Sequence, residues 1–366
     1  MQLSFARSTI RSTIAARLFR SIAFLAASVG CARAFAQAPA PPPQPTPSIV
    51  YRAYEPDAMH GYQADPEVVR QMVDQLVCAV TRQPDVARAW RSLVSPNDRV
   101  GIKISAAGGE LFTTHRSVVN AIVDGLVAAG QSRSKIIVWD RSLGGIKKAG
   151  YTGNEGYQLR AITPRDGYDA KATISEPFLG NLIWGDFEYA GGKGEVPLLS
   201  DDSNTSSISH IAKIVANDVT KIINVPVFCN SERNGVAGCL YNVTIPNIDN
   251  WRRFGVPPDY GASSIAEIYA DPRIGRKVVL NIMDGLLAEY AGGPESQPNY
   301  AFTFDTLYAS RDPVAIDSIA LRQISEWRKK RRLPVIGRTG ENVEVAAQMG
   351  LGNSNPKEIE IRNVGR

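Results

Sequence analysis

The order of three neighbouring segments constrains the fold of this chain more than any other feature. Residues 99–104 and 135–140 have the continuous apolar pattern of buried strands. Between them, residues 114–129 carry apolar side chains at helical spacing, with Thr114 placed to cap the helix and Gly130 to end it. A strand, a helix and a second strand with short connections predict a parallel pair joined by a right-handed crossover.

The rest of the chain extends this unit into an α/β fold. Two more strands and two more helices are predicted: strands at 221–228 and 277–283, a helix at 65–81 and a helix that starts near Asp312 and Pro313. Residues 143–203 are rich in glycine and aromatic residues, which indicates an irregular or antiparallel insertion. We therefore expect one α/β domain at 51–366, with a mostly parallel sheet flanked by helices.

The N-terminus is typical of an export signal. Four arginines precede an apolar run at 21–30, and Ala34–Ala36 is a small-x-small cleavage pattern, so residues 1–36 are a predicted signal peptide. The run is too short for a permanent membrane anchor. Lipid attachment at Cys31 is a second, less favoured interpretation. The prolines that follow predict a disordered linker at 37–50. The signal peptide predicts a mature protein that is periplasmic or secreted.

The charge of the chain depends on that signal segment. The whole chain has a net charge of +5, but residues 1–36 hold five arginines and no acidic residue, so the remainder is neutral. A nucleic-acid partner is therefore not expected. The basic cluster at 328–332 follows a helical pattern, and we interpret it as a cationic helix C-terminus. The mature chain has no predicted membrane-spanning segment.

Candidate ligand-binding residues follow the first predicted strand. In open α/β folds, ligands bind beyond the carboxyl ends of strands and near helix N-termini. Lys103 lies near the end of this strand, Gly108 and Gly109 follow, and Thr114 and His115 lie at the start of the helix. This combination suits a small anion. An ordinary strand-to-helix turn is the alternative, because the glycines match no phosphate-binding fingerprint.

Three residues are candidates for proton transfer. Asp140 ends the second strand, Asp284 follows a later strand in the same way, and His115 lies at a helix N-terminus. The alternatives are that the aspartates cap turns and that His115 is a hydrogen-bonded cap residue. His60 and His210 show no partner in the sequence, and we expect them on the surface.

The mature chain keeps three cysteines, which is an odd number for an exported protein. Cys229 and Cys239 flank a turn-rich loop that could close a disulfide. A metal or redox role for Cys229 is the alternative, although the spacing matches no common metal motif. Cys78 lies within a helical pattern and is interpreted as a small buried hydrophobe.

Several of these segments together resemble the domain-of-unknown-function 362 (DUF362) family, some members of which have iron-sulfur centres. The segments that carry the resemblance are 100–104, 113–116, 136–140, 222–227, 280–285 with Gly293 and Pro294, and 309–317. Membership implies an α/β domain and assigns no reaction.

The sequence departs from this family at positions where chemistry would be expected. Many members carry Lys-x-His after the Pro-Val strand and a Lys-Asn pair soon after it. Cys229–Ser231 replaces the first motif here, and Tyr241 with Asn242 replaces the second. In the nickel-pincer lactate racemases, which the family distantly resembles, lysine and histidine hold the cofactor. No complete four-cysteine iron-sulfur motif is present. The cofactor is therefore unknown, and a bound metal stays an open alternative.

Two functional hypotheses follow from these residues. The first is an exported enzyme of redox or isomerase type that binds an anionic small molecule or a metal-bearing cofactor. Its crevice would be lined by Lys103, His115, Asp140, Cys229, Asn242 and Asp284. The second is a non-catalytic periplasmic protein that uses the crevice for ligand binding or assembly. The enzyme hypothesis requires that all six side chains meet at one rim of the sheet.

Overall fold

The computed structural model describes residues 47–365 except 182–188, 191–204, 258 and 337–338. The described residues belong to one compact unit of the chain. The predicted signal peptide and most of the predicted linker lie outside the described residues. The end of that linker is corrected: Ser48–Val50 begin strand β1 (Ser48–Tyr54), because they pair with residues 359–361 near the C-terminus.

One sheet contains most of the strands in the described part of the chain. Its order is β14-β1-β13-β12-β9-β4-β5-β6, and two more strands bring it to ten: β10, which pairs with β12, and β11, which pairs with β10. The remaining bounds are β4 Val100–Ile104, β5 Ile137–Ser142, β6 Gln158–Thr163, β9 Lys221–Val225, β10 Val227–Ser231, β11 Gly235–Val236, β12 Val278–Glu289, β13 Ala301–Ser310 and β14 Ile359–Val364. All run in one direction except β11 and β13. The predicted mostly parallel α/β fold is confirmed.

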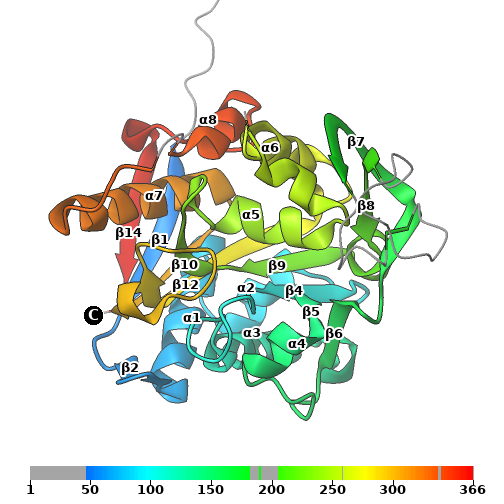
Figure 1. Cartoon of the computed structure of the whole chain (residues 1–366). Coiled ribbons are helices and arrows are strands. Elements are labelled where there is room, and N and C mark those ends of the chain that lie inside the picture. The colour runs from blue at the N-terminus through cyan, green and yellow to red at the C-terminus, as the bar shows by residue number, and fades with distance from the viewer. Residues whose placement is uncertain (1–46, 182–188, 191–204, 258, 337–338, 366) are drawn as a thin grey trace, which may run out of the picture. The chain divides into compact units, whose positions relative to one another are not determined.

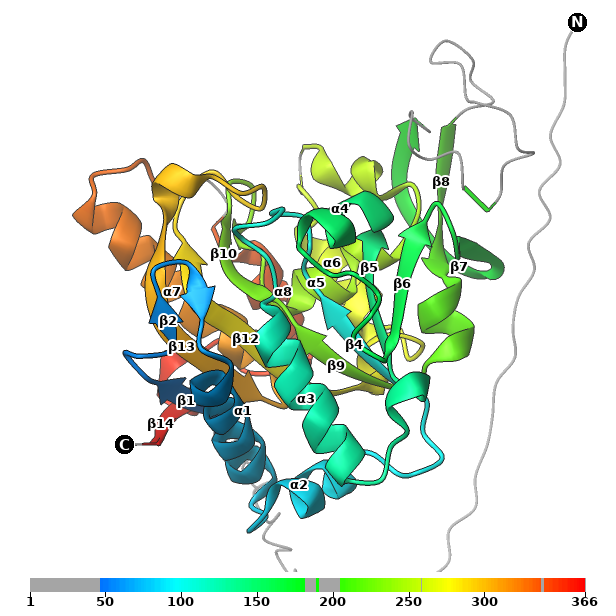
Figure 2. The same cartoon turned by 90° about the horizontal axis from the view of Figure 1, so that it is seen from below.

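Helices cover both faces of this sheet (Figures 1 and 2). Their bounds are α1 Pro66–Thr81, α2 Val86–Leu93, α3 Arg116–Ala128, α4 Leu143–Lys148, α5 Cys239–Val243, α6 Ala262–Ala270, α7 Pro313–Lys330 and α8 Glu341–Gln348. Helices α1 to α4 pack on the face that contains Ile102 and Ile223, and α5 to α8 pack on the face that contains Trp139 and Ile222. Alternate residues of each strand therefore enter two separate cores.

The first strand-helix-strand unit forms as predicted, with β4 and β5 as parallel neighbours. The helix cap is corrected. His115, not Thr114, is the N-cap of α3, and no side chain caps that helix. Thr114 is instead fully buried, and its hydroxyl group is satisfied there: Oγ1 donates to Val225 O and accepts from Ser105 N. In contrast, Asp65 and Asp312 cap α1 and α7, each just before a proline, as their sequences predict.

Two strand boundaries differ from the sequence pattern. The apolar run at 221–228 is divided at Pro226 into β9 and β10, because proline lacks the N–H that a continuous ladder needs. Strand β12 does not end before Asp284 but continues to Glu289, because β13 pairs antiparallel along its extension. The register between β12 and β13 shifts after Gly285, so Asp284 lies at an irregular point inside a long strand.

The region expected to be an irregular or antiparallel insertion contains regular elements of both parallel and antiparallel kinds. It supplies α4 and β6, and β6 joins the main sheet parallel to β5. It also supplies β7 (Tyr168–Asn181), which pairs antiparallel with β8 (Thr205–Ala212).

The small elements complete the description. Strands β2 (Met59–His60) and β3 (Gln63–Ala64) pair with each other. Single helical turns lie at Arg133–Lys135, Ile214–Asp218, Ile245–Asn247, Trp251–Gly255, Gly275–Lys277, Pro298–Tyr300 and Pro356–Glu358. Within the described ranges, no helix has the length and hydropathy that crossing a membrane would require.

Candidate functional site

A buried ion pair joins the ends of β4 and β5. Lys103 is fully buried, and its ammonium donates to Asp140 Oδ1 at 2.6 Å, to Ile104 O at 2.7 Å and to Asn242 Oδ1 at 3.2 Å. These bonds use all three of its donors. Burial lowers the pKa of Lys103, and the charge of Asp140 offsets part of that effect. Lys103 therefore positions other side chains and has no donor left for a ligand.

Asp140 is held by two strong donors. Its Oδ2 accepts the Ala106 backbone N–H at 2.7 Å, while Oδ1 accepts from Lys103. Its side chain is 9% exposed. Because a carboxylate has about four acceptor positions, each oxygen keeps room for another hydrogen bond.

A row of polar side chains crosses the sheet from Lys103. Asn224 lies beside Lys103 on β9, Asn281 lies beside Asn224 on β12, and Ser310 lies beside Asn281 on β13. Asn242 Nδ2 donates to Asn224, Asn224 Nδ2 donates to Asn281, and Asn281 Nδ2 donates to Ser310 O. The row lies beneath α5 and satisfies polar groups that would otherwise be costly to bury.

Helix α5 is fixed by an aspartate of another helix. Asp317 on α7 is fully buried and accepts the backbone N–H groups of Cys239 and Leu240 at 2.6 and 2.9 Å. Burial raises the pKa of Asp317 to about 7. Because α5 carries Tyr241 and Asn242, Asp317 positions both of these residues.

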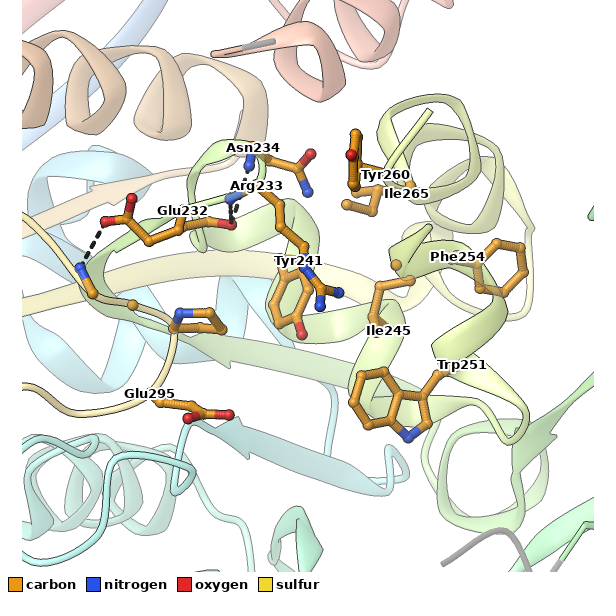
Figure 3. Close-up of a pocket in the computed structure, with 16 residues that line it drawn as sticks. Glu232, Arg233, Asn234, Tyr241, Ile245, Trp251, Phe254, Tyr260, Ile265 and Glu295 are labelled. Carbon is orange, nitrogen blue, oxygen red and sulfur yellow. Dashed lines mark hydrogen bonds between the residues drawn. The ribbon is translucent and has the colours of Figure 1, made fainter. Parts of the chain in front are cut away.

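Two adjoining pockets at this end of the sheet form one crevice. The inner lobe has a volume of about 230 Å³ and is lined by Asp140, Cys229 and Asn242 together with mostly apolar side chains. The outer lobe has a volume of about 290 Å³ (Figure 3). The two lobes share the lining residues Tyr241, Ile245, Trp251, Pro294 and Glu295. The name crevice is used below for these two lobes.

The outer lobe contains a cation that sequence reasoning missed. Arg233 extends from the loop between β10 and β11 into the lobe, near Tyr241 (Figure 3), and its guanidinium lies against Gly255. No residue in the described part of the chain bonds to this guanidinium. The loop pattern was interpreted only as a disulfide-closing turn. A charged residue among its turn-forming neighbours was the available signal.

The expected disulfide is absent, because Cys229 and Cys239 both have free, buried thiols. They belong to different hydrophobic cores, Cys229 with α1 to α4 and Cys239 with α5 to α8. Cys229 Sγ lies 3.9 Å from Glu289 Oε1, and burial with this neighbouring carboxyl raises the pKa of the thiol. Burial also raises the pKa of Glu289 to about 7.

The donor set does not fit a metal centre in the described residues, where no three His, Cys, Asp or Glu side chains are grouped. A metal role for Cys229 therefore lacks the partners that a protein-held metal needs.

His115 and Asp284 lie outside the crevice. Asp284 Oδ2 is 2.9 Å from His115 Nδ1 and also accepts the His115 backbone N–H at 2.7 Å. Burial by itself lowers the pKa of His115, but the charge and hydrogen bond of Asp284 outweigh it and raise that pKa. His115 lines a separate pocket of about 720 Å³ beside α3, called the α3 pocket below. That pocket shares no lining residue with the crevice.

The loop between β4 and α3 does not form the expected anion cradle. Gly108 forms a bridge with Phe112, whose carbonyl oxygen leaves no space for a Cβ, and Gly109 has a φ of +71°. Both glycines therefore make a tight turn. The backbone N–H groups of Ser105 and Ala106 bind Thr114 and Asp140. Asp284 itself supplies the anion at the start of α3.

The expectation for His210 is wrong. His210 is buried, its Nδ1 lies 2.9 Å from Asp249 Oδ2, and Asp249 Oδ1 accepts its backbone N–H at 2.5 Å. A partner 39 residues away is invisible to local pattern reasoning. His60 is 67% exposed, as expected.

Comparisons with known proteins identify a family and no activity. A search of curated proteins gave no match. A solved structure of a Thermotoga maritima protein is 13% identical with a TM-score of 0.39, and the alignment covers 74% of this chain and 60% of that one. Residues 100–322 match the model of DUF362, a domain of unknown function. This match covers more than half of the chain and includes both the Lys103 and the His115 pairs, so the chain belongs to the DUF362 family.

Proposed function

We propose that this chain is an exported enzyme that binds a small organic anion in the crevice and transfers a proton to and from it through Asp140. The observation that carries this proposal is that the acidic member of the Lys103–Asp140 pair faces the cavity and the basic member does not. Lys103 is sealed from solvent, whereas the Asp140 carboxylate lines the inner lobe. A carboxylate that is paired with a buried cation and turned toward a mostly apolar cavity is suited to accept a proton or a hydrogen bond from a ligand.

Arg233 is the proposed partner of the anionic group of the ligand. Its guanidinium enters the outer lobe and has no bond to any described residue. A planar guanidinium can bind a carboxylate or phosphate through two parallel hydrogen bonds. Because the two lobes adjoin at Tyr241 and Trp251, a ligand held by Arg233 can reach the inner lobe with its uncharged part.

A non-catalytic ligand-binding protein is the second candidate, and one observation favours it. Both oxygens of Asp140 already accept short bonds, from Lys103 and from Ala106 N–H. Such donors already occupy acceptor positions that a base would use to take up a proton. In that case Asp140 would orient the ligand by hydrogen bonding, and no proton would be exchanged.

Deuterium exchange separates these two candidates. A panel of small carboxylates and phosphate esters is first screened for an increase in melting temperature of the purified protein. Each ligand that binds is then incubated with the protein in D2O, and its C–H signals are followed by NMR. Deuterium uptake that is lost in Asp140→Asn, while binding is kept, supports the enzyme. Binding without uptake supports the binding protein.

Arg233→Gln is the matched test of recognition. Loss of the charged contact is expected to weaken anion binding by roughly tenfold or more. Arg276→Gln is the control, because Arg276 is absent from the lining of both lobes. If no anion binds, or if both variants bind equally well, the crevice is not the site of anion recognition.

Export is tested on the full chain. Cell fractionation and N-terminal sequencing after expression in a bacterial host are expected to give an extracytoplasmic protein that begins at Gln37. Lipid on Cys31 would instead support the anchored form, and an intact cytoplasmic chain would contradict export.

A further inference from the structure

The α3 pocket contains an imidazole that is fixed on one side and accessible on the other. The Nδ1 atom and the backbone N–H of His115 are both held by Asp284 Oδ2. The side chain of Asp284 is fully buried, whereas that of His115 is 14% exposed and lines the pocket. No described residue bonds to His115 Nε2. The ring therefore has a defined orientation and one nitrogen free for a ligand.

The second histidine-aspartate pair shows that this arrangement alone is not a site. His210 is attached to Asp249 through the same two atoms, Nδ1 and the backbone N–H. Its side chain is only 5% exposed, and its ring packs edge-on against Tyr189, with the two ring centroids 4.9 Å apart. The two pairs share their geometry and differ in exposure, and His115 lines the α3 pocket.

Arg116, the next residue, adds an uncommitted positive charge. It is exposed, lines the α3 pocket, and its guanidinium is bonded to no described residue. The other two arginines of the pocket, Arg70 and Arg133, are both bound to Asp124.

The acidic residues of the pocket are mostly committed. Glu155 accepts backbone N–H groups from Thr152 and Gly153. Glu110 is the remaining acid, and it lies in the loop before α3. The pocket therefore offers two neighbouring donors without a described partner, His115 Nε2 and the Arg116 guanidinium.

We propose that the α3 pocket is a second ligand site, in which His115 Nε2 and the Arg116 guanidinium bind an oxyanion group of a small polar molecule. Asp284 fixes the His115 tautomer and stabilises its protonated form, so that Nε2–H points to the oxyanion as a donor. The raised pKa of His115 agrees with this role. Because the pocket and the crevice have no lining residue in common, this site can fail or hold independently of the proposed function.

Diethyl pyrocarbonate, which acylates accessible imidazole nitrogens, tests the site with two anions. Because the reagent acylates only unprotonated imidazole, the purified protein is treated at a fixed pH high enough that part of His115 is unprotonated, alone and with inorganic phosphate or acetate. The rate of modification of each histidine is measured by peptide mass spectrometry. His60, which is 67% exposed, is the reactive control, and His210, which is 5% exposed, is the protected one. We expect His115 to react, and phosphate or acetate to slow its reaction without slowing that of His60.

Two arginine variants decide whether the protection is specific. Arg116→Gln is expected to weaken protection by roughly tenfold or more, through loss of a charge-assisted contact. Arg70→Gln removes the same charge from the same pocket, but Arg70 is bound to Asp124 at 2.6 Å, so protection should persist. The proposal is overturned if His115 is inert without anions, if neither anion protects it, or if Arg116→Gln is protected as well as the unmodified protein.

Discussion

The crevice and the α3 pocket each contain a charged pair, but the pairs are turned in opposite directions. In the crevice, the cation Lys103 is sealed and the carboxylate of Asp140 lines the cavity. In the α3 pocket, the carboxylate of Asp284 is sealed and the imidazole of His115 lines the cavity. Each sealed partner has several bonds to the protein, and each open partner keeps a position for a ligand.

If both proposed sites bind ligands, one sheet presents two kinds of chemistry. The sealed member orients its partner, and the open member offers the group that a ligand would meet. An open carboxylate accepts protons and hydrogen bonds, whereas an open imidazole held by a carboxylate offers a hydrogen-bond donor. The two charged pairs can be tested separately. The polar side chains that extend from Lys103 lie under α5, whereas Asp284 faces α3.

The largest effect is expected from breaking the Lys103–Asp140 ion pair of the crevice. Lys103→Met leaves Asp140 and Asn242 without their buried donor, and we expect a loss of about 3–5 kcal/mol in the free energy of unfolding. Urea unfolding measures it. The double variant Lys103→Met with Asp140→Leu should recover part of this loss. An equal loss in both proteins would show that the pairing of the charges is not the cause.

A pH-dependent effect is expected at Asp317, which holds α5 beneath the crevice. Its pKa is raised to about 7 in the folded protein, so ionisation opposes folding. This cost is absent below the unfolded pKa near 4, grows between pH 4 and 7, and is complete above pH 7. Relative to the unmodified protein, Asp317→Asn should therefore gain stability across this window, on the order of 2–4 kcal/mol. Unfolding curves at several pH values would contradict this if the difference stayed constant.

The α3 pocket should respond to pH through its histidine. Asp284→Asn removes the charge that opposes burial, so the pKa of His115 should fall below its ordinary value, as followed by NMR titration. Because the folded pKa is raised in the unmodified protein, the stabilisation from this ion pair is complete below pH 6.5 and is lost as pH rises through the folded pKa. We expect a cost of about 1–3 kcal/mol at low pH, shrinking at high pH. An unchanged His115 titration would remove Asp284 as the cause.

The smallest effect on stability is expected at Arg233 and Arg116, whose guanidinium groups bond to no described residue. Arg233→Gln and Arg116→Gln should each change the free energy of unfolding by less than about 0.5 kcal/mol, because exposed side chains without partners contribute little. Thermal unfolding measures this. A large loss in either variant would show a structural role and would weaken the argument that the guanidinium is free for a ligand.

Local patterns predicted much of the framework. The apolar runs at 99–104 and 135–140 formed the parallel pair β4 and β5, and Asp65 and Asp312 capped the helices that follow them. These features depend on neighbours in the sequence. A strand depends on the periodicity of its buried side chains, and a helix cap depends on backbone N–H groups within one turn. The continuation of β12 past Asp284 was missed because its cause is the pairing with β13.

The grouping of the candidate site residues was predicted only in part. Lys103, Asp140 and Asn242 meet as expected, and Cys229 lines the same lobe. His115 and Asp284 were expected in that crevice, but they form a pair of their own at the α3 pocket. Strand ends indicate which residues reach the rim of a sheet, and they do not indicate how side chains from different strands divide between cavities.

The sequence by itself determined the α/β class, the core strands and which polar residues lie near strand ends, because each follows from spacing along the chain. Only the tertiary structure decided which member of each charged pair is sealed, that Cys229 and Cys239 lie in different cores, and that Arg233 enters the crevice. These outcomes depend on contacts between residues far apart in the chain. Burial and access are properties of the packed molecule, which no local pattern contains.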